Sequence, residues 1–158
     1  MSALDLEVVS WMIQDSLKTA SSRFKLAVSV AVCDRRGFLI GFARDREAKI
    51  STIDSAQRKA FTAVQLGSST LDRIEAWKRN DARNLGYYDF LLSSIPGGAP
   101  VRDSGGAIIG GIGVSSDLSA SDDQKIADLS AEVLSNIVSG TQQLDVQVRF
   151  DSKGGAQV

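Results

Sequence analysis

The stretch "LAVSVAVCDRRGFLIGFAR" (Leu26–Arg44) decides the fold class. Two runs rich in valine, alanine and other apolar residues flank the polar turn "DRRG", a pattern typical of a β-hairpin. A second unit of this kind follows, in which "APVRD" and "AIIGGIGVS" flank a turn at Asp103–Gly106. Strands joined by tight turns are antiparallel. The chain is therefore expected to contain two antiparallel hairpins.

Helical patterns surround both hairpins. We expect helices at about residues 4–20, 52–66, 68–80 and 121–140, the second ending at Gly67 and the last beginning with Ser121 and Gln124 as a capping box. Strict alternation over Leu144–Phe150 predicts a further strand. This order predicts an α+β fold with an antiparallel sheet of about five strands flanked by helices. We expect residues 1–143 to form one domain and residues 144–158 to form a strand and polar tail that could take part in subunit contacts.

The composition is that of a compact soluble protein. The 158 residues are 43% hydrophobic and 23% charged, which argues against disorder. A formal net charge of −1 offers no footprint for nucleic acid or an anionic membrane. The N-terminus lacks the pattern of a signal peptide, and no window has the roughly 20 apolar residues of a membrane span. The single cysteine, Cys33, lies in an apolar run, so we expect a buried thiol and a cytoplasmic protein.

The absence of histidine restricts function more than any motif. It removes the commonest metal ligand and the usual general base near neutral pH. Serine hydrolysis is disfavoured because the chain has neither a G-x-S-x-G elbow nor a histidine base. Zinc catalysis lacks histidine and paired cysteines. Asp122 and Asp123 are adjacent acids at a helix start, where capping and the helix dipole explain them better than a metal site does.

The stretch "KISTIDSAQRKAFTAVQLGSST" (Lys49–Thr70) predicts a helix with one face of small side chains. The alanines on that face are Ala56, Ala60 and Ala63. Lys59 falls at its border, so it either extends to solvent along a packed edge or directs its ammonium group at an anionic ligand in a cleft. Asp54 and Arg58 have the (i, i+4) spacing of an exposed ion pair.

Glycines dominate the stretch "IPGGAPVRDSGGAIIGGIGVS" (Ile95–Ser115). The proline and two glycines of "IPGG" can bring unobstructed backbone amides against a ligand. Glycines inside a strand, here Gly110, Gly111 and Gly113, indicate a bulge or the close approach of a ligand or of a packed helix. The spacing matches neither a dinucleotide fingerprint nor a phosphate loop.

Four motifs together resemble the GlcG/HbpS-like family, a domain also found at the C-terminus of some corrinoid adenosyltransferases. They are the hairpin "VAVCDRRGFLIG" with its D-x-x-G turn, the helix "AQRKAFTAV" with K-A-x-T-A, the loop "PGGAPV", and "GGAIIGGIGVS" followed by the acidic helix start "SDDQKIA". The resemblance covers about Leu26–Ile137. It implies a profilin-like α+β domain that assembles into a homo-oligomer such as a tetramer or octamer.

The resemblance also implies a ligand. Members of the family include proteins that bind or degrade haem, but a chain without histidine cannot supply a histidine ligand to haem or corrinoid. Tyrosine, lysine, methionine and the single Cys33 are left as axial ligands. Tyr87 and Tyr88 could serve, with aromatic packing as the alternative use. The K-A-x-T-A motif carries over Lys59 and Thr62 as candidate pocket residues.

Three hypotheses for function follow. The first is a metal-free enzyme of a catabolic or biosynthetic pathway, acting on a small, anionic organic substrate in a glycine-lined cleft. The second is a haem-binding or haem-degrading protein without a histidine ligand, and the third is a structural accessory subunit. The candidate catalytic residues are Lys59, Tyr87, Tyr88, Asp89 and Arg102. The candidate ligand-binding residues are Thr62, Pro96, Gly97, Gly98, Gly110 and Gly111.

Overall fold

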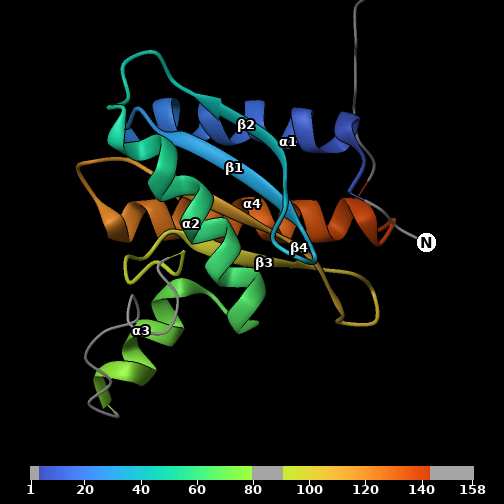
Figure 1. The fold of residues 1–158 in the computed structure, drawn as a ribbon. Helices are drawn as coiled ribbons and strands as arrows, with labels where there is room; N and C mark the ends of the chain where they lie inside the picture. Colours follow the sequence, from blue (N-terminus) through green and yellow to red (C-terminus); the bar gives the residue numbers. More distant parts are fainter. Residues whose placement is uncertain (1–3, 80–90, 143–158) are drawn as a thin grey trace, which may run out of the picture.

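The computed structural model describes residues 4–79 and 91–142, and they form an α+β fold (Figure 1). A four-stranded antiparallel sheet packs against helices on both faces, as the sequence predicts. The elements in chain order are α1 (Leu6–Thr19), a π-helical turn η1 (Ala20–Phe24), β1 (Ser29–Asp34), β2 (Leu39–Arg44), α2 (Ser51–Leu66), α3 (Thr70–Arg79), β3 (Gly98–Arg102), β4 (Ile108–Ser115) and α4 (Ala120–Val138).

The sheet has the strand order β2-β1-β4-β3, with every neighbouring pair antiparallel. Both predicted hairpins are confirmed. The first closes with a hydrogen bond of 2.9 Å from the Gly37 amide to the Asp34 carbonyl, and the second with one of 3.0 Å from Gly106 to Asp103. The fifth strand that the sequence predicts, at residues 144–150, lies outside the described residues.

The two faces of the sheet carry side chains of different size. Val30, Val32, Ile112 and Val114 belong to the large core beneath α1 and α4. The alternate residues on β1, Ala31 and Cys33, pack instead with Ala56, Ala60 and Val64 of α2. Figure 1 shows α2 lying across the opposite face of the sheet from α1 and α4. The face beneath α2 is therefore made of small residues.

Glycines let α2 approach β4 more closely than any side chain would allow. A Cβ atom on Gly113 would lie 2.0 Å from the carbonyl oxygen of Ala56, and one on Gly111 would lie 2.7 Å from that of Ala60. Both distances are far below van der Waals contact. Of the explanations that the sequence leaves open for these two glycines, the structure shows helix packing against a bare strand.

The helix ends are confirmed in part. Helix α2 ends at Gly67, whose φ of 67° is the left-handed conformation that favours glycine. The capping box predicted at Ser121 is wrong, because α4 begins one residue earlier and Ser119 is its cap, with its Oγ accepting a hydrogen bond from the Asp122 amide. Serine at three nearby positions, residues 116, 119 and 121, makes the true cap hard to choose from sequence. No helix within the described residues is both long and apolar enough to cross a membrane.

The contact between α2 and β4 predicts a large effect of one added methyl group. We expect Gly113→Ala to lower the free energy of unfolding by about 1–3 kcal/mol or more, because the new Cβ meets a helix backbone that cannot rotate away. Gly105→Ala is the control, since its Cβ would meet only the Asp103 side chain, at 3.3 Å, and should change stability by about 0.5 kcal/mol or less. Urea unfolding followed by circular dichroism measures both, and equal stabilities would contradict the packing argument.

Candidate functional site

A buried ion pair joins α2 to the start of α4. Lys59 and Asp123 are each 1% exposed, and the Lys59 Nζ lies 3.0 Å from Asp123 Oδ2. Lys59 follows Ala56 by three residues and precedes Ala60 and Ala63, so the helix period turns it toward the sheet with the alanines. A charge in that position requires a partner of opposite sign.

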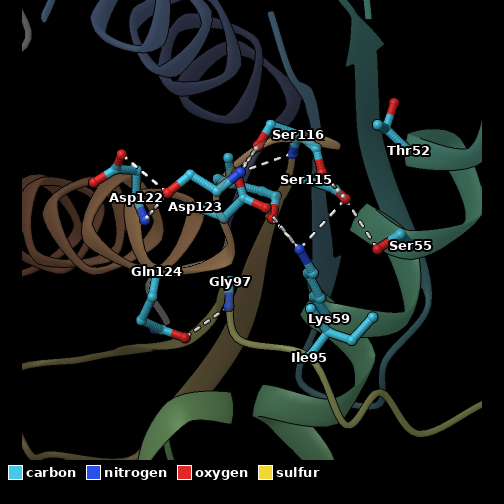
Figure 2. Close-up of polar contacts among 12 residues, drawn as sticks. Thr52, Ser55, Lys59, Ile95, Gly97, Ser115, Ser116, Asp122, Asp123 and Gln124 are labelled. Carbon is cyan, nitrogen blue, oxygen red and sulfur yellow. Dashed lines mark hydrogen bonds and ion pairs between the residues drawn. The ribbon is translucent and has the colours of Figure 1, made fainter. Parts of the chain in front are cut away.

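Every donor of the Lys59 ammonium group has a partner inside the protein (Figure 2). Besides Asp123, the Nζ donates to the Val114 carbonyl at 3.0 Å and to the Ser115 Oγ at 3.3 Å. The second oxygen of Asp123 accepts a hydrogen bond of 2.9 Å from the Ser116 amide. Because an ammonium group has three donors, the network satisfies the charge completely.

The environment shifts the pKa values of the pair in opposite directions. Burial lowers the pKa of Lys59, against the opposing effect of the Asp123 charge and hydrogen bond. Burial likewise raises the pKa of Asp123, against the effects of Lys59 and Ser116. Each charge thus compensates the desolvation of the other. Both acids lie in the first turn of α4, as expected. Asp123 also holds the buried ion pair with Lys59, which the sequence did not predict, and Asp122 pairs with Lys125 at 2.9 Å.

The "GG" loop is fastened to two helices by side chains that the sequence analysis did not select. The Gln124 Oε1 accepts from the Gly97 amide at 2.7 Å, and the Gln124 Nε2 donates to the Gly98 carbonyl at 3.0 Å. The Thr70 Oγ1 accepts from the amides of both glycines, at 3.0 and 2.9 Å. The bare amides of this loop are therefore bonded within the protein.

The structure brings Lys59 next to the "GG" loop, and Arg102 has other partners. A Cβ on Gly97 would lie 2.9 Å from the Lys59 Nζ, so the lysine and the loop are in contact. Arg102 lies elsewhere and donates to the carbonyls of Gly67 and Gly106, both at 2.9 Å. The catalytic roles of Lys59 and Arg102 stay predictions. The other candidates, Tyr87, Tyr88 and Asp89, lie outside the described residues.

The predicted ligand-binding residues also have contacts within the protein. Thr62 donates to the Arg58 carbonyl and accepts from the Ser93 amide, both at 2.7 Å. A Cβ on Gly110 would lie 2.3 Å from the Leu4 side chain, while Gly111 faces α2. Pro96 is half-buried. A ligand role for these residues stays a prediction.

A pocket lies on the outer side of α2, where the helix meets the β1–β2 hairpin. We call this hollow of about 270 Å³ the hairpin pocket. Its lining is mostly apolar, with a few polar groups contributed by α2. The lining residues are Cys33, Gly37, Phe38, Leu39, Asp54, Gln57, Arg58, Phe61 and Leu91. Among the described residues, none of those proposed from sequence as catalytic or ligand-binding lines this pocket.

The polar side of the hairpin pocket carries paired charges. Arg58 Nε lies 2.6 Å from Asp54 Oδ2, which confirms the predicted exposed ion pair. At the turn, the Arg36 guanidinium lies 5.3 Å from the centre of the Phe38 ring and 3.5 Å from Asp34 Oδ2. The turn itself is held to α2 by a hydrogen bond of 3.1 Å from Gln65 Nε2 to the Arg36 carbonyl. Cationic and aromatic groups therefore meet where the hairpin turn joins α2.

Cys33 lines the hairpin pocket with a protonated thiol. The residue is 2% exposed, as its apolar surroundings predict, and its Sγ donates to the Gly111 carbonyl at 3.6 Å. Burial raises the pKa of the thiol from 9.0 to about 12. Within residues 4–79 and 91–142, no group of three or more histidine, cysteine, aspartate or glutamate side chains is placed to hold a metal ion.

Comparison with known proteins identifies the family. The sequence profile described as "Haem degrading protein HbpS-like" matches residues 4–132. The chain belongs to the HbpS-like family. No curated protein sequence matches this HbpS-like protein at a significant level.

Solved structures share the fold of this HbpS-like protein. A double mutant of HbpS from Streptomyces reticuli is 31% identical, with a TM-score of 0.73, over 84% of this chain and 87% of that one. The ORFY protein of Klebsiella pneumoniae is 25% identical, with a TM-score of 0.74, over 84% and 90%. A complex of PduOC with heme is 22% identical, with a TM-score of 0.67, over 82% and 94%, and shows likeness of fold alone.

The buried ion pair predicts a strong effect on stability. We expect Lys59→Met to lower the free energy of unfolding by about 3–5 kcal/mol, because it leaves the Asp123 charge buried without its partner. Lys59→Met combined with Asp123→Leu should recover much of this loss. Lys125→Met is the control, since its pair with Asp122 is exposed and should contribute about 1 kcal/mol or less. Urea unfolding measures all three, and equal losses for Lys59→Met and Lys125→Met would refute the account.

The raised pKa of Cys33 predicts that its thiol reacts slowly with alkylating reagents. Only the thiolate reacts with iodoacetamide, and a pKa that rises from 9.0 to about 12 lowers the thiolate fraction at pH 8 by about a thousandfold. We expect alkylation of the folded protein to be slower than that of the urea-unfolded chain by at least this factor, and to accelerate tenfold per pH unit up to about pH 12 where the fold persists. Mass spectrometry counts the modification at the single cysteine. Similar rates in the folded and unfolded states would contradict the prediction.

Proposed function

We propose that this HbpS-like protein binds haem or a closely related tetrapyrrole in the hairpin pocket. The observation that carries the proposal is the pocket itself, which combines an apolar lining with a few polar groups of α2. Small-molecule sites commonly have this composition. The sequence profile of the family is described as that of a haem-degrading protein, and the structure of a protein with the same fold was solved as a heme complex.

Exposed apolar side chains supply the surface that a ligand would cover. Phe38 is 65% exposed, Leu39 50% and Leu91 39%, and all three line the hairpin pocket. Large apolar side chains gathered at one hollow indicate a binding site more than scattered ones do. A porphyrin ring is flat and apolar, so it can lie against aromatic and leucine side chains.

Cationic groups suit the acidic substituents of a tetrapyrrole. Arg58 lines the hairpin pocket, and Arg36 lies against Phe38, which also lines it. Their pairs with Asp54 and Asp34 are partly exposed to solvent, and exposed ion pairs contribute little to stability. Guanidinium groups form strong hydrogen bonds with carboxylates.

The described residues fit the ring of haem and its carboxylates better than they fit its iron. The chain has no histidine, and Cys33 at the hairpin pocket holds its proton because burial raises its pKa to about 12. A thiol in that state is a poor iron ligand, since coordination requires the thiolate. The proposal therefore concerns binding of the ring and assigns no axial ligand.

Two further expectations remain open to test. The metal-free enzyme, with Lys59 as base or nucleophile, stays a prediction, and the complete internal hydrogen bonding of that ammonium group weighs toward a structural role. A homo-oligomer, tetramer or octamer, is likewise proposed from family membership, and native mass spectrometry measures it directly.

A haem titration with a matched pair of variants tests the binding proposal. We expect a saturable Soret shift for the wild type and about tenfold weaker binding for Phe38→Ser, because covering a phenylalanine is worth roughly 1.5–3 kcal/mol. Leu118→Ser is the control, since Leu118 is 78% exposed and does not line the hairpin pocket. The proposal fails if no saturable shift occurs, or if both variants weaken binding equally.

A further inference from the structure

The described residues offer few side chains that could coordinate the iron of a bound haem. Apart from Met1, the chain has one methionine, Met12, which is 1% exposed and belongs to the core beneath α1 and α4. Cys33 is the soft ligand that lines the hairpin pocket, and its Sγ is directed at the Gly111 carbonyl. Lys59 is held in its internal ion pair. Among residues 4–79 and 91–142, the usual protein ligands of haem iron are thus either missing or engaged elsewhere.

The size of the hairpin pocket also keeps the iron away from its floor. The volume of about 270 Å³ is just below the roughly 300–1,000 Å³ typical of sites that enclose a small molecule. A tetrapyrrole is large and flat, so this hollow admits one edge of the ring. Because the iron lies at the centre of the ring, edge insertion leaves it outside the reach of the buried Cys33 thiol.

The remaining contacts of the hairpin pocket with a tetrapyrrole do not depend on the central metal. Phe38 and Leu39 are 65% and 50% exposed in this structure, so a ligand that lies against them would bury apolar surface. The burial of apolar area depends on the ring and its substituents. The attraction between Arg58 and a carboxylate depends on the acidic side arms. Neither contribution changes when iron is removed.

We propose that the hairpin pocket recognises a tetrapyrrole through one apolar edge and its carboxylates, without coordinating the central metal, so that iron-free porphyrin binds as tightly as haem. This inference rests on the proposed function and specifies its ligand class. It assigns the protein to tetrapyrroles in general, with or without a metal. Binding energy comes from Phe38, Leu39 and Phe61 against the ring and from Arg58 at its acidic side.

The experiment compares haemin with iron-free protoporphyrin IX on the same purified, full-length protein. Calorimetric titration gives both dissociation constants with one readout that does not depend on the absorbance of iron. We expect the two constants to agree within about threefold. Arg58→Gln should weaken both ligands by the same severalfold factor. Arg46→Gln, which changes an arginine whose side chain is 90% exposed and does not line the hairpin pocket, should leave both unchanged.

The outcomes separate this inference from the proposed function. Haemin binding at least tenfold tighter than protoporphyrin would overturn the inference, because iron would then contribute a bond, while binding of haem would still stand. In that case Tyr87→Phe and Tyr88→Phe would show whether a phenol supplies it. If neither compound binds saturably, the proposed function fails as well. Equal affinities that Phe38→Ser reduces by equal factors would support both.

Discussion

The close contact between the α2 backbone and β4 is the constraint on which the rest of the structure depends. It requires glycine at the positions of β4 that face the helix, because a Cβ on Gly113 would lie 2.0 Å from a helix carbonyl. It also requires alanines on the helix and small side chains on β1. Little side-chain volume therefore lies between α2 and β4. The large side chains of the core lie on the opposite face, beneath α1 and α4.

The same contact explains why Lys59 needs Asp123. A long side chain on the alanine face of α2 cannot reach solvent past a backbone packed this closely, so its charge is buried at the end of β4. The start of α4 supplies the counter-charge, and the carbonyl of Val114 and hydroxyl of Ser115 complete the shell. The ion pair thereby connects the helices on the two faces of the sheet. Gln124, the next residue on α4, extends the connection to the "GG" loop.

Sequence patterns predict local features well and contacts between distant segments poorly. Short-range rules of turn, cap and spacing predict both hairpins and the end of α2 at Gly67. They also predict the exposed pair of Asp54 and Arg58. The partnership of Lys59 with Asp123 joins residues 64 positions apart, which no local rule detects. One signal was available: a lysine that shares a helix face with three alanines is buried, and a buried lysine requires a carboxylate. The hairpin pocket had no such signal, because its walls come together only when the turn packs on α2.

The two faces of helix α2 have different surroundings. On the inner face, Ala56 and Ala60 pack against the sheet and Lys59 forms an internal ion pair. The outer face, with Gln57, Arg58 and Phe61, lines the hairpin pocket together with the turn. Substitutions on the inner face are expected to change how the helix packs, whereas under the proposed function those on the outer face change ligand affinity. The packing that keeps the fold and the ligand contacts that we propose therefore lie on different faces of the same helix.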